Sequence, residues 1–283
     1  MKVLAHGGAG HTPAEPAARQ AALDSAVETG VTAERPLDAV ETTLRRLEDD
    51  PRFNAGVGSA VQSDGVIRTD AGLMTGEGQI GAAAAMPGVQ HAASVARIVL
   101  AETPHVMVAG DRASALAAEF GIETEADLWT ERSRERWADA SPPEGGPRAQ
   151  LDWVREQFGG HDTIGAVATD GDAIAVGTST GGRWFALAGR VGDVPQVGSG
   201  FYASERAAAS ATGAGEDIAQ VTLSRLAVDL VESGADPATA AERALAAFEE
   251  LTGSTAGLIV LDPSGDRGRA FNSAAMQTAW RAD

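Results

Sequence analysis

The run His161-Asp162-Thr163-Ile164-Gly165-Ala166-Val167-Ala168 decides the fold of this chain. It directly follows the polar segment 127–160, which proline and glycine interrupt. Cleavage before Thr163 would expose a threonine that carries a hydroxyl nucleophile and a free α-amine, and this amine can act as the base. A threonine at the start of a strand is otherwise an ordinary β-former. The run therefore indicates either a simple strand start or the scissile bond of a self-cleaving precursor.

A hairpin is predicted directly after this point. The β-rich runs Thr163–Thr169 and Ala173–Thr180 flank the turn sequence Asp170-Gly171-Asp172. Either two-residue turn places a second hydroxyl roughly 5 Å from that of Thr163, Cβ to Cβ. The opposite residue is Thr180 if Gly171-Asp172 form the turn, Thr178 if Asp170-Gly171 form it, and Ser179 in a three-residue loop.

The remaining pattern separates strands from helices and contains several hairpins, which favours an α+β protein of stacked layers over a βαβ array. We read 1–283 as a single domain, with 127–161 as a flexible linker inside it. Strands are expected at 3–5, 60–69, 79–86, 105–109, 257–261 and 268–271, the last two closing the chain. Helices are expected at 15–28, 36–47, 94–100, 113–120, 203–210, 216–233 and 237–251, with a brief one around Leu151, Trp153, Val154 and Phe158.

Composition excludes several classes of protein. With 22 basic and 40 acidic residues the net charge is −18, and such a surface repels nucleic acid and anionic membranes. No run approaches the ~18 apolar residues of a membrane helix. The chain has no cysteine and its N-terminus is too short for a signal peptide, so we expect a cytoplasmic protein. Lys2 is the only lysine, and this together with dispersed acid is typical of adaptation to high salt.

Several motifs allow chemistry but have ordinary alternatives. The stretch His6–Gly10 lacks the spacing of a nucleotide-binding loop, so we expect a tight turn that lets other segments approach closely. The five histidines show no metal-site spacing. Arg190 and Asp193 could hold the carboxylate and ammonium of a free amino acid, or form a solvated ion pair. Thr212 and the glycines after it could stabilise an oxyanion, cap a helix, or do both.

Taken in order, the motifs resemble those of the plant-type asparaginase/isoaspartyl peptidase family of N-terminal nucleophile hydrolases. They span nearly the whole chain, and the set is specific even though no single member is. The matching stretches are His6-Gly7-Gly8-Ala9-Gly10, Phe53-Asn54-Ala55-Gly56, Asp162-Thr163-Ile164-Gly165-Ala166-Val167-Ala168, Thr178-Ser179-Thr180-Gly181-Gly182, Gly189-Arg190-Val191-Gly192-Asp193 and Thr212-Gly213-Ala214-Gly215-Glu216.

The resemblance implies a four-layer αββα sandwich that cuts itself between Asp162 and Thr163 into chains 1–162 and 163–283, which pair into an (αβ)₂ assembly. It implies hydrolysis of L-asparagine and of β-aspartyl dipeptides, with no required cofactor. The implied roles are Thr163 as nucleophile, Thr180 orienting it, Asn54 beside it, Thr212 and Gly213 as oxyanion hole, and Arg190, Asp193, Gly213 and Gly215 as substrate contacts. A structural sodium ion would bind the backbone loop of Leu47, Glu48, Asp50, Phe53, Ala55 and Val57.

Other readings stay open. Asp162 stands where many asparaginases of this family have glycine, and His161-Asp162-Thr163-Ile164-Gly165 resembles glycosylasparaginases, which cut the glycan–asparagine amide. The stretch Asn272–Met276 matches the C-terminal pattern of the family only loosely. A threonine endopeptidase of the taspase kind fits less well, because the Arg190/Asp193 pair favours a free amino-acid end. An uncleaved binding protein that keeps the fold is a further alternative.

Overall fold

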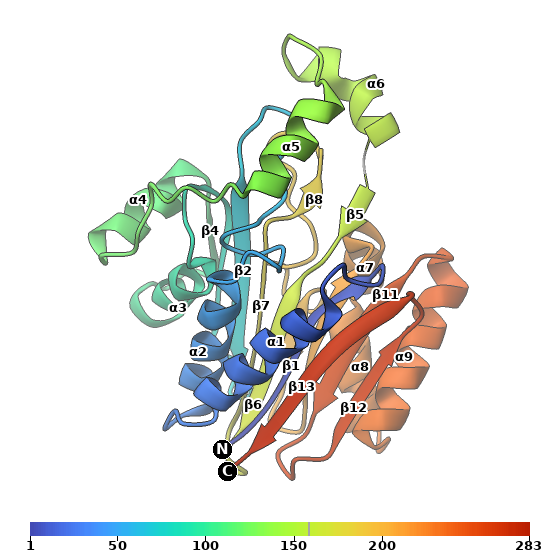
Figure 1. Cartoon of the computed structure of the whole chain (residues 1–283). Coiled ribbons are helices and arrows are strands. Elements are labelled where there is room, and N and C mark those ends of the chain that lie inside the picture. The colour runs from blue at the N-terminus through green and yellow to red at the C-terminus, as the bar shows by residue number, and fades with distance from the viewer. Residues whose placement is uncertain (158) are drawn as a thin grey trace.

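The protein is a sandwich of four layers, in which two β-sheets are stacked and each is covered on its outer face by helices (Figure 1). The computed structural model describes residues 1–157 and 159–283, and of 159–161 it describes the backbone alone. The expected α+β sandwich is confirmed.

The larger sheet has seven strands and carries the predicted hairpin at its centre. Its order is β13 (Ala275–Ala282), β1 (Lys2–Gly10), β6 (Ile164–Thr169), β7 (Ile174–Thr180), β2 (Arg68–Thr75), β3 (Ile80–Pro87) and β4 (Met107–Ala109). The helices associated with it are α1 (Pro16–Gly30), α2 (Pro36–Glu48), α3 (Ala92–Glu102) and α4 (Asp111–Glu119).

Helix α2 shows how sequence pattern becomes packing. Pro36 occupies its first turn, where the missing N–H costs nothing. Leu37, Val40, Leu44 and Leu47 recur at helical spacing and are buried in the core between α2 and the large sheet. Helix α2 contacts both β6 and β7, so this packing fixes the hairpin from behind.

The smaller sheet has four strands and faces the first one. Its order is β12 (Arg267–Phe271), β11 (Ala256–Leu261), β10 (Ala208–Gly213) and β9 (Phe201–Ala203), covered by α8 (Leu223–Glu232) and α9 (Pro237–Thr252), with α7 (Gly215–Val221) after β10. A separate apolar core lies between the sheets. There Phe201 sits over Gly72 so closely that a Cβ on the glycine would lie 2.0 Å from the ring. The sheets therefore approach where small residues permit it.

Four expectations about elements were wrong. The strand expected at 60–69 is mostly a loop, because the chain turns at Asp64-Gly65 between the isolated bridge partners Val61 and Ile67, and β2 begins only at Arg68. The helix expected over 203–210 is the end of β9 and the start of β10, because these alanines fill a tight space between β9, β11 and the opposite layers. Tertiary packing overrides the helix preference of alanine. The chain does not close at 271, since β13 returns to pair with β1 in the other sheet. The helix expected over 216–233 is broken at Thr222, which has φ +53.

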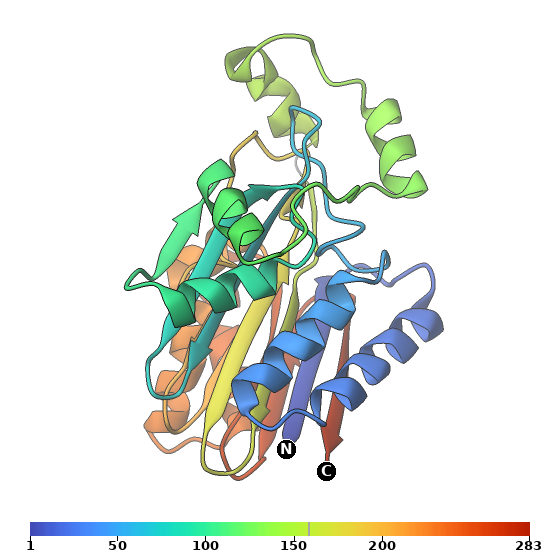
Figure 2. The same ribbon diagram turned by 90° about the vertical axis from the view of Figure 1, so that its left-hand side faces the viewer.

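The expected linker contains two helices, α5 (Glu131–Ala140) and α6 (Pro147–Gln157), which project at one end of the molecule (Figure 2). Thr130 caps α5 by accepting a hydrogen bond from Ser133 N. Helix α6 coincides with the brief helix expected there, although Phe158 lies outside the described residues. Strand β5 (Gly159–His161) then pairs with β8 (Arg183–Trp184). Whether this segment is flexible stays a prediction.

No helix in the described part of the chain is long and apolar enough to cross a membrane.

Candidate active site

The Asp162–Thr163 peptide bond joins β5 to β6, which follow each other along the chain (Figure 1). Ile164 pairs with Ser179, so Thr163 comes opposite Thr180 when the register is continued by one residue. The turn is therefore Gly171-Asp172, the first of the expected registers. Thr163 is buried at 6% exposure, and its amide N–H donates to the Thr212 hydroxyl at 3.3 Å.

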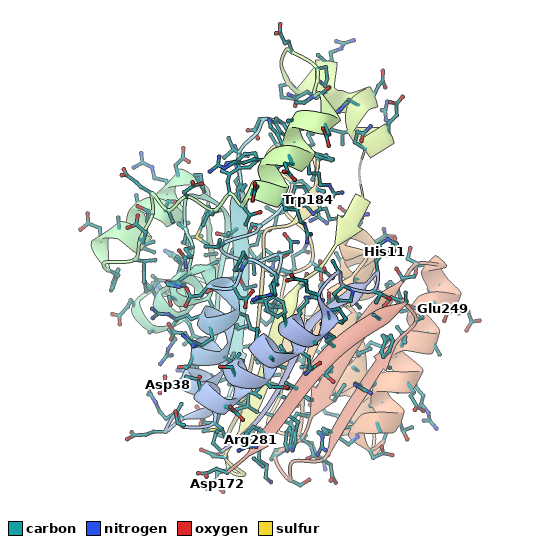
Figure 3. The ribbon with its side chains drawn as sticks, in the orientation of Figure 1. His11, Asp38, Asp172, Trp184, Glu249 and Arg281 are labelled. Atoms are coloured by element: carbon teal, nitrogen blue, oxygen red, sulfur yellow. The ribbon has the colours of Figure 1, made fainter. Side chains whose placement is uncertain are left out.

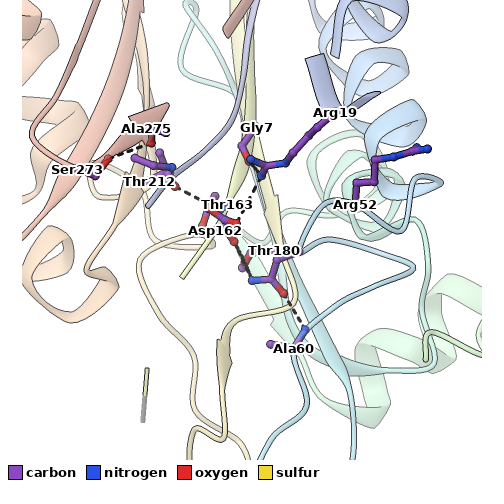
Figure 4. A network of polar contacts seen from close by, with 12 residues as sticks. Gly7, Arg19, Arg52, Ala60, Asp162, Thr163, Thr180, Thr212, Ser273 and Ala275 are labelled. Atoms are coloured by element: carbon purple, nitrogen blue, oxygen red, sulfur yellow. Dashed lines mark hydrogen bonds and ion pairs between the residues drawn. The ribbon is translucent and has the colours of Figure 1, made fainter. Parts of the chain in front are cut away.

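Two donors hold the carbonyl oxygen of Asp162. Asn54 Nδ2 donates to it at 2.8 Å and Thr180 Oγ1 at 3.1 Å (Figure 4). The Thr180 hydroxyl accepts from Gly182 N–H at 3.1 Å, which leaves its own proton for Asp162. Asn54 is fixed in turn, since its Oδ1 accepts from Ala60 N–H at 2.7 Å and its Nδ2 also donates to the Gly182 carbonyl at 2.7 Å. Donors so placed stabilise negative charge on that oxygen.

The side chain of Asp162 is held from the other side by Arg19. Their ion pair measures 3.5 Å, and Arg19 also donates to the Gly7 carbonyl and packs over the Phe53 ring. Burial raises the pKa of Asp162, and the nearby Arg19 guanidinium opposes this rise. The carboxylate lies so close to Gly8 that a Cβ there would be 2.5 Å from Oδ1.

The glycines of His6–Gly10 therefore allow the expected close approach, but they do not form a turn. They belong to β1, whose pairing with β13 shifts in register between His6 and Ala9. His6 is fully buried, with Nε2 2.7 Å from Ser210 Oγ. Burial lowers the pKa of His6 to about 3, so the ring is neutral at any working pH.

Thr212 is the penultimate residue of β10 and lies against Thr163. Its buried hydroxyl accepts from the amides of Thr163 and Ala9, the latter at 3.4 Å. It does not cap α7, because the N-cap residue is Ala214 and makes no side-chain cap. The capping reading of Thr212 was therefore wrong. Gly213 follows at φ +141, a conformation that favours glycine.

Arg190, Asp193 and Gly215 come together as expected. A Cβ on Gly215 would lie 2.5 Å from Asp193 Oδ1 and 2.8 Å from Arg190 Nη2, so both side chains rest on the bare glycine. Gly215 is three residues after Thr212, whose hydroxyl contacts Thr163. Three residues of extended chain span at most about 11 Å, so the backbone of Gly215 lies within about that distance of the backbone of Thr212. A cationic fork and a carboxylate here can hold the two charged ends of one amino acid.

Arg190 hydrogen-bonds to Glu216, whereas the sequence alone allowed an ion pair between Arg190 and Asp193. Arg190 Nε donates to Glu216 Oε1 at 2.8 Å, and Arg183 Nη1 donates to Glu216 Oε2 at 3.0 Å. Within the described residues, Asp193 Oδ2 has no hydrogen-bond partner and is buried. Burial raises the pKa of Asp193 to about 6, against the influence of Arg190. Asp193 is therefore a carboxylate that a cationic ligand would satisfy.

Sequence reasoning missed three charged residues around this centre. Arg19 gives no signal within its alanine-rich helix. Glu216 was named only as the last residue of the stretch Thr212–Glu216, without a catalytic or binding role of its own. Asp70 stands opposite Thr180 in the sheet, is 2% exposed, and accepts a hydrogen bond from Ala85 N–H; burial raises its pKa to about 7. A lone carboxylate leading into the apolar run 71–74 was the available signal for Asp70.

The loop expected to hold sodium runs from the end of α2 at Glu48 past Asn54 to Val57. The carbonyls of Leu47, Glu48 and Asp50 each accept one backbone hydrogen bond, and those of Phe53, Ala55 and Val57 accept none within the described residues. The Glu48 side chain turns inward instead, and its Oε1 accepts from Ser179 Oγ at 2.6 Å. In the described chain no cluster of three or more His, Cys, Asp or Glu side chains could hold a metal. Free carbonyl oxygens suit a hard cation.

A buried threonine at a strand start between two stacked sheets, with donors on the preceding carbonyl, is an arrangement that suits an N-terminal nucleophile hydrolase. A family model described as asparaginase matches residues 1–283. The chain therefore belongs to this asparaginase family.

Relatives of similar sequence cover most or nearly all of the chain. A plant-type L-asparaginase of Pyrococcus furiosus is 37% identical over 99% of this chain and 96% of its own length. A plant-type L-asparaginase of Thermococcus kodakarensis is 39% identical over 87% of this chain and 83% of its own. An isoaspartyl peptidase/L-asparaginase of Danio rerio is 37% identical over 99% of this chain and 91% of its own.

Proposed function

We propose that this protein is an autoprocessed threonine amidohydrolase that cleaves the side-chain amide of L-asparagine and the isopeptide bond of β-aspartyl dipeptides, releasing aspartate. The observation that carries the proposal is the pair of donors, Asn54 and Thr180, on the carbonyl that precedes Thr163. A structural threonine at a strand start needs no such donors. The names of the relatives support the substrate class.

The geometry supports self-cleavage by the following steps. The Thr163 hydroxyl attacks the carbonyl carbon of Asp162, and Asn54 and Thr180 stabilise the oxyanion. The C–N bond breaks as the Thr163 nitrogen takes a proton, which leaves an ester between Asp162 and the Thr163 oxygen. Water then hydrolyses the ester to the Asp162 carboxylate and a free Thr163 with its α-amine.

Turnover uses the same threonine with a new base. The α-amine titrates near 8 in model peptides, so a useful fraction is unprotonated at neutral pH. The Thr163 hydroxyl attacks the substrate's side-chain carbonyl, whose oxyanion faces Thr212 and Gly213. Arg190 binds the α-carboxylate of the substrate, and Asp193 with Gly215 binds its α-ammonium. Ammonia or the peptide amine leaves, and water releases aspartate from the acyl-enzyme.

Sodium and assembly complete the proposal. A sodium ion would bind the loop carbonyls from Leu47 to Val57 and stiffen the segment that carries Asn54. We expect no cofactor in the reaction itself. The two chains would pair as (αβ)₂ in the cytoplasm.

Replacement of the nucleophile tests the proposal. The Thr163→Ala protein should remain a single 28.9 kDa chain without asparaginase activity, whereas Thr163→Ser should still split. Intact mass spectrometry with N-terminal sequencing measures cleavage, and ammonia release measures activity. A Thr163→Ala chain that still splits before residue 163 would refute the mechanism. A wild-type chain that never splits would favour the uncleaved binding protein.

A further inference from the structure

Four of the five tryptophans gather in one aromatic cluster. Its members come from both sides of the proposed cleavage site in the sequence. Trp137 of α5 lies at 6.4 Å from Trp129, 6.3 Å from Trp153 and 6.2 Å from Phe185, between ring centroids. Phe185 also meets Trp153 at 5.2 Å and Trp184 at 5.8 Å. Three tryptophans precede Thr163, and Trp184 and Phe185 follow it. Figure 3 shows Trp184 directly beside α5.

Polar contacts reinforce this cluster. Arg136 of α5 lies over the Trp184 ring at 4.3 Å, where the cation favours the face of the ring. Trp153 of α6 donates its indole N–H to the Ala140 carbonyl at 3.1 Å, which joins α6 to the end of α5. The two linker helices are thus tied to each other and to β8.

Hydrogen bonds of two neighbouring residues, Gln62 and Ser63, connect α6 with the turn that carries Arg190. Ser63 Oγ donates to Gln150 Oε1 at 2.7 Å and accepts from Ala188 N–H at 3.0 Å. Its neighbour Gln62 accepts from Gly189 N–H at 2.8 Å and donates to the Arg190 carbonyl at 3.1 Å. Gln150 and Ser63 are buried. The turn before Arg190 therefore rests partly on a residue of the linker.

The backbone of this turn is strained at Phe185. Its φ is +60, which is unfavourable for a bulky side chain. Such a conformation persists only where the surroundings over-determine it, and here the surroundings are the rings of Trp137, Trp153 and Trp184. The linker helices therefore hold Phe185 in place, five residues before Arg190.

We propose that segment 129–153 is a positioning element for substrate binding: it stays docked after cleavage and, through Trp137, Trp153 and Gln150, holds the Trp184–Arg190 turn so that Arg190 meets the α-carboxylate. This rests on the proposed function, because it presupposes cleavage at Thr163 and amino-acid binding by Arg190. Trp137, Trp153 and Gln150 touch no substrate and act through Phe185 and Ser63.

The test compares Trp137→Ala with Trp137→Phe, and uses Trp280→Ala as the matched control, since Trp280 lies on β13 outside the cluster. Cleavage is followed by intact mass, the cluster by near-ultraviolet circular dichroism, and kinetics by ammonia release from asparagine. We expect all variants to cleave. Trp137→Ala should raise KM about tenfold with little change in kcat, because a shifted arginine weakens binding more than chemistry. Trp137→Phe should restore the wild-type KM.

A fully cleaved Trp137→Ala enzyme with lost aromatic dichroism and an unchanged KM would overturn the positioning role while leaving the proposed function intact. Failure of the wild-type chain to cleave would instead refute the proposed function. If Trp137→Ala does not fold, Gln150→Leu decides, because it keeps every ring and removes one contact to Ser63. A raised KM in that variant supports the proposal, and an unchanged KM overturns it.

Discussion

Asp193 is a carboxylate whose charge depends on what lies beside it. It is buried, and its Oδ2 meets no donor within the described chain, while Arg190 is bound to Glu216. Burial raises the pKa of Asp193 to about 6. As pH rises, the unfolded chain therefore loses the proton of this carboxyl group first, and the folded protein keeps it until the pH reaches about 6. A protonated Asp193 cannot attract an ammonium group. If Asp193 binds the substrate ammonium as proposed, this binding competes with proton binding at the same carboxylate.

We predict that kcat/KM for asparagine falls as pH drops through about 6, by up to about tenfold for each pH unit below it. The Thr163 amine also gains a proton in this range. For that reason the measurement is the ratio of wild-type to Asp193→Asn kcat/KM between pH 5 and pH 8, in which the amine contribution cancels. The ratio should rise with pH through about 6 and then level off. A ratio independent of pH would contradict the role of Asp193.

At the scale of elements, the two sheets approach each other closely beside Thr163. A Cβ on Gly165 of β6 would lie 1.9 Å from Ser210 Oγ on β10 and 2.3 Å from His6 Nε2 on β1. Neither neighbour can retreat easily, because both are fully buried and bonded to each other. Gly165 therefore sets the separation of the sheets two residues after Thr163.

Gly165→Ala should lower the free energy of unfolding by about 1–3 kcal/mol, as overpacked cores do, and should slow self-cleavage. Gly146→Ala is the control, because an added Cβ there meets nothing within 4 Å. Chemical denaturation and the time course of cleavage by mass spectrometry provide the two readouts. Equal stability of the two variants would show that the sheets can separate without cost.

Local patterns predicted some elements better than others. Helix α2 and the β6–β7 hairpin have clear periodicity and turn residues, and both are where the sequence placed them. Strand β10 is rich in alanine, whose helix preference loses to burial between two layers. Strand β13 mixes apolar and polar residues at the edge of the sheet and gave no signal. Its assignment depends on β1, almost the full chain length away.

The candidate site divides in the same way. Thr163, Thr180, Thr212, Arg190 and Asp193 belong to short motifs and were named in advance. The partners that tune them come from distant segments. Arg19 reaches Asp162 from α1, Asp70 comes opposite Thr180 from β2, and Gln150 reaches the Arg190 turn from α6. Only the fold brings these together, so no local pattern could show that they meet the site.

At the scale of the whole molecule, the dominant property is charge. A net charge of −18 opposes the compact state by self-repulsion, and salt screens that repulsion. The free energy of unfolding at neutral pH should therefore rise between about 0.1 M and about 2 M potassium chloride. The same titration near pH 4.6, the isoelectric point of the sequence, is the control, because little net charge remains to screen. A salt response equal at both pH values would argue against repulsion as its cause.

The order of strands in the larger sheet has a consequence for the life of the mature protein. Strand β1, from before the proposed cut, lies between β6 and β13, both from after it. An unfolded precursor carries β1 tethered to its neighbours and can refold alone. Once the chain is cut, refolding requires two separate molecules to meet, so recovery becomes second order and slows on dilution. Maturation would thus give the enzyme its nucleophile and at the same time make each unfolding event harder to reverse.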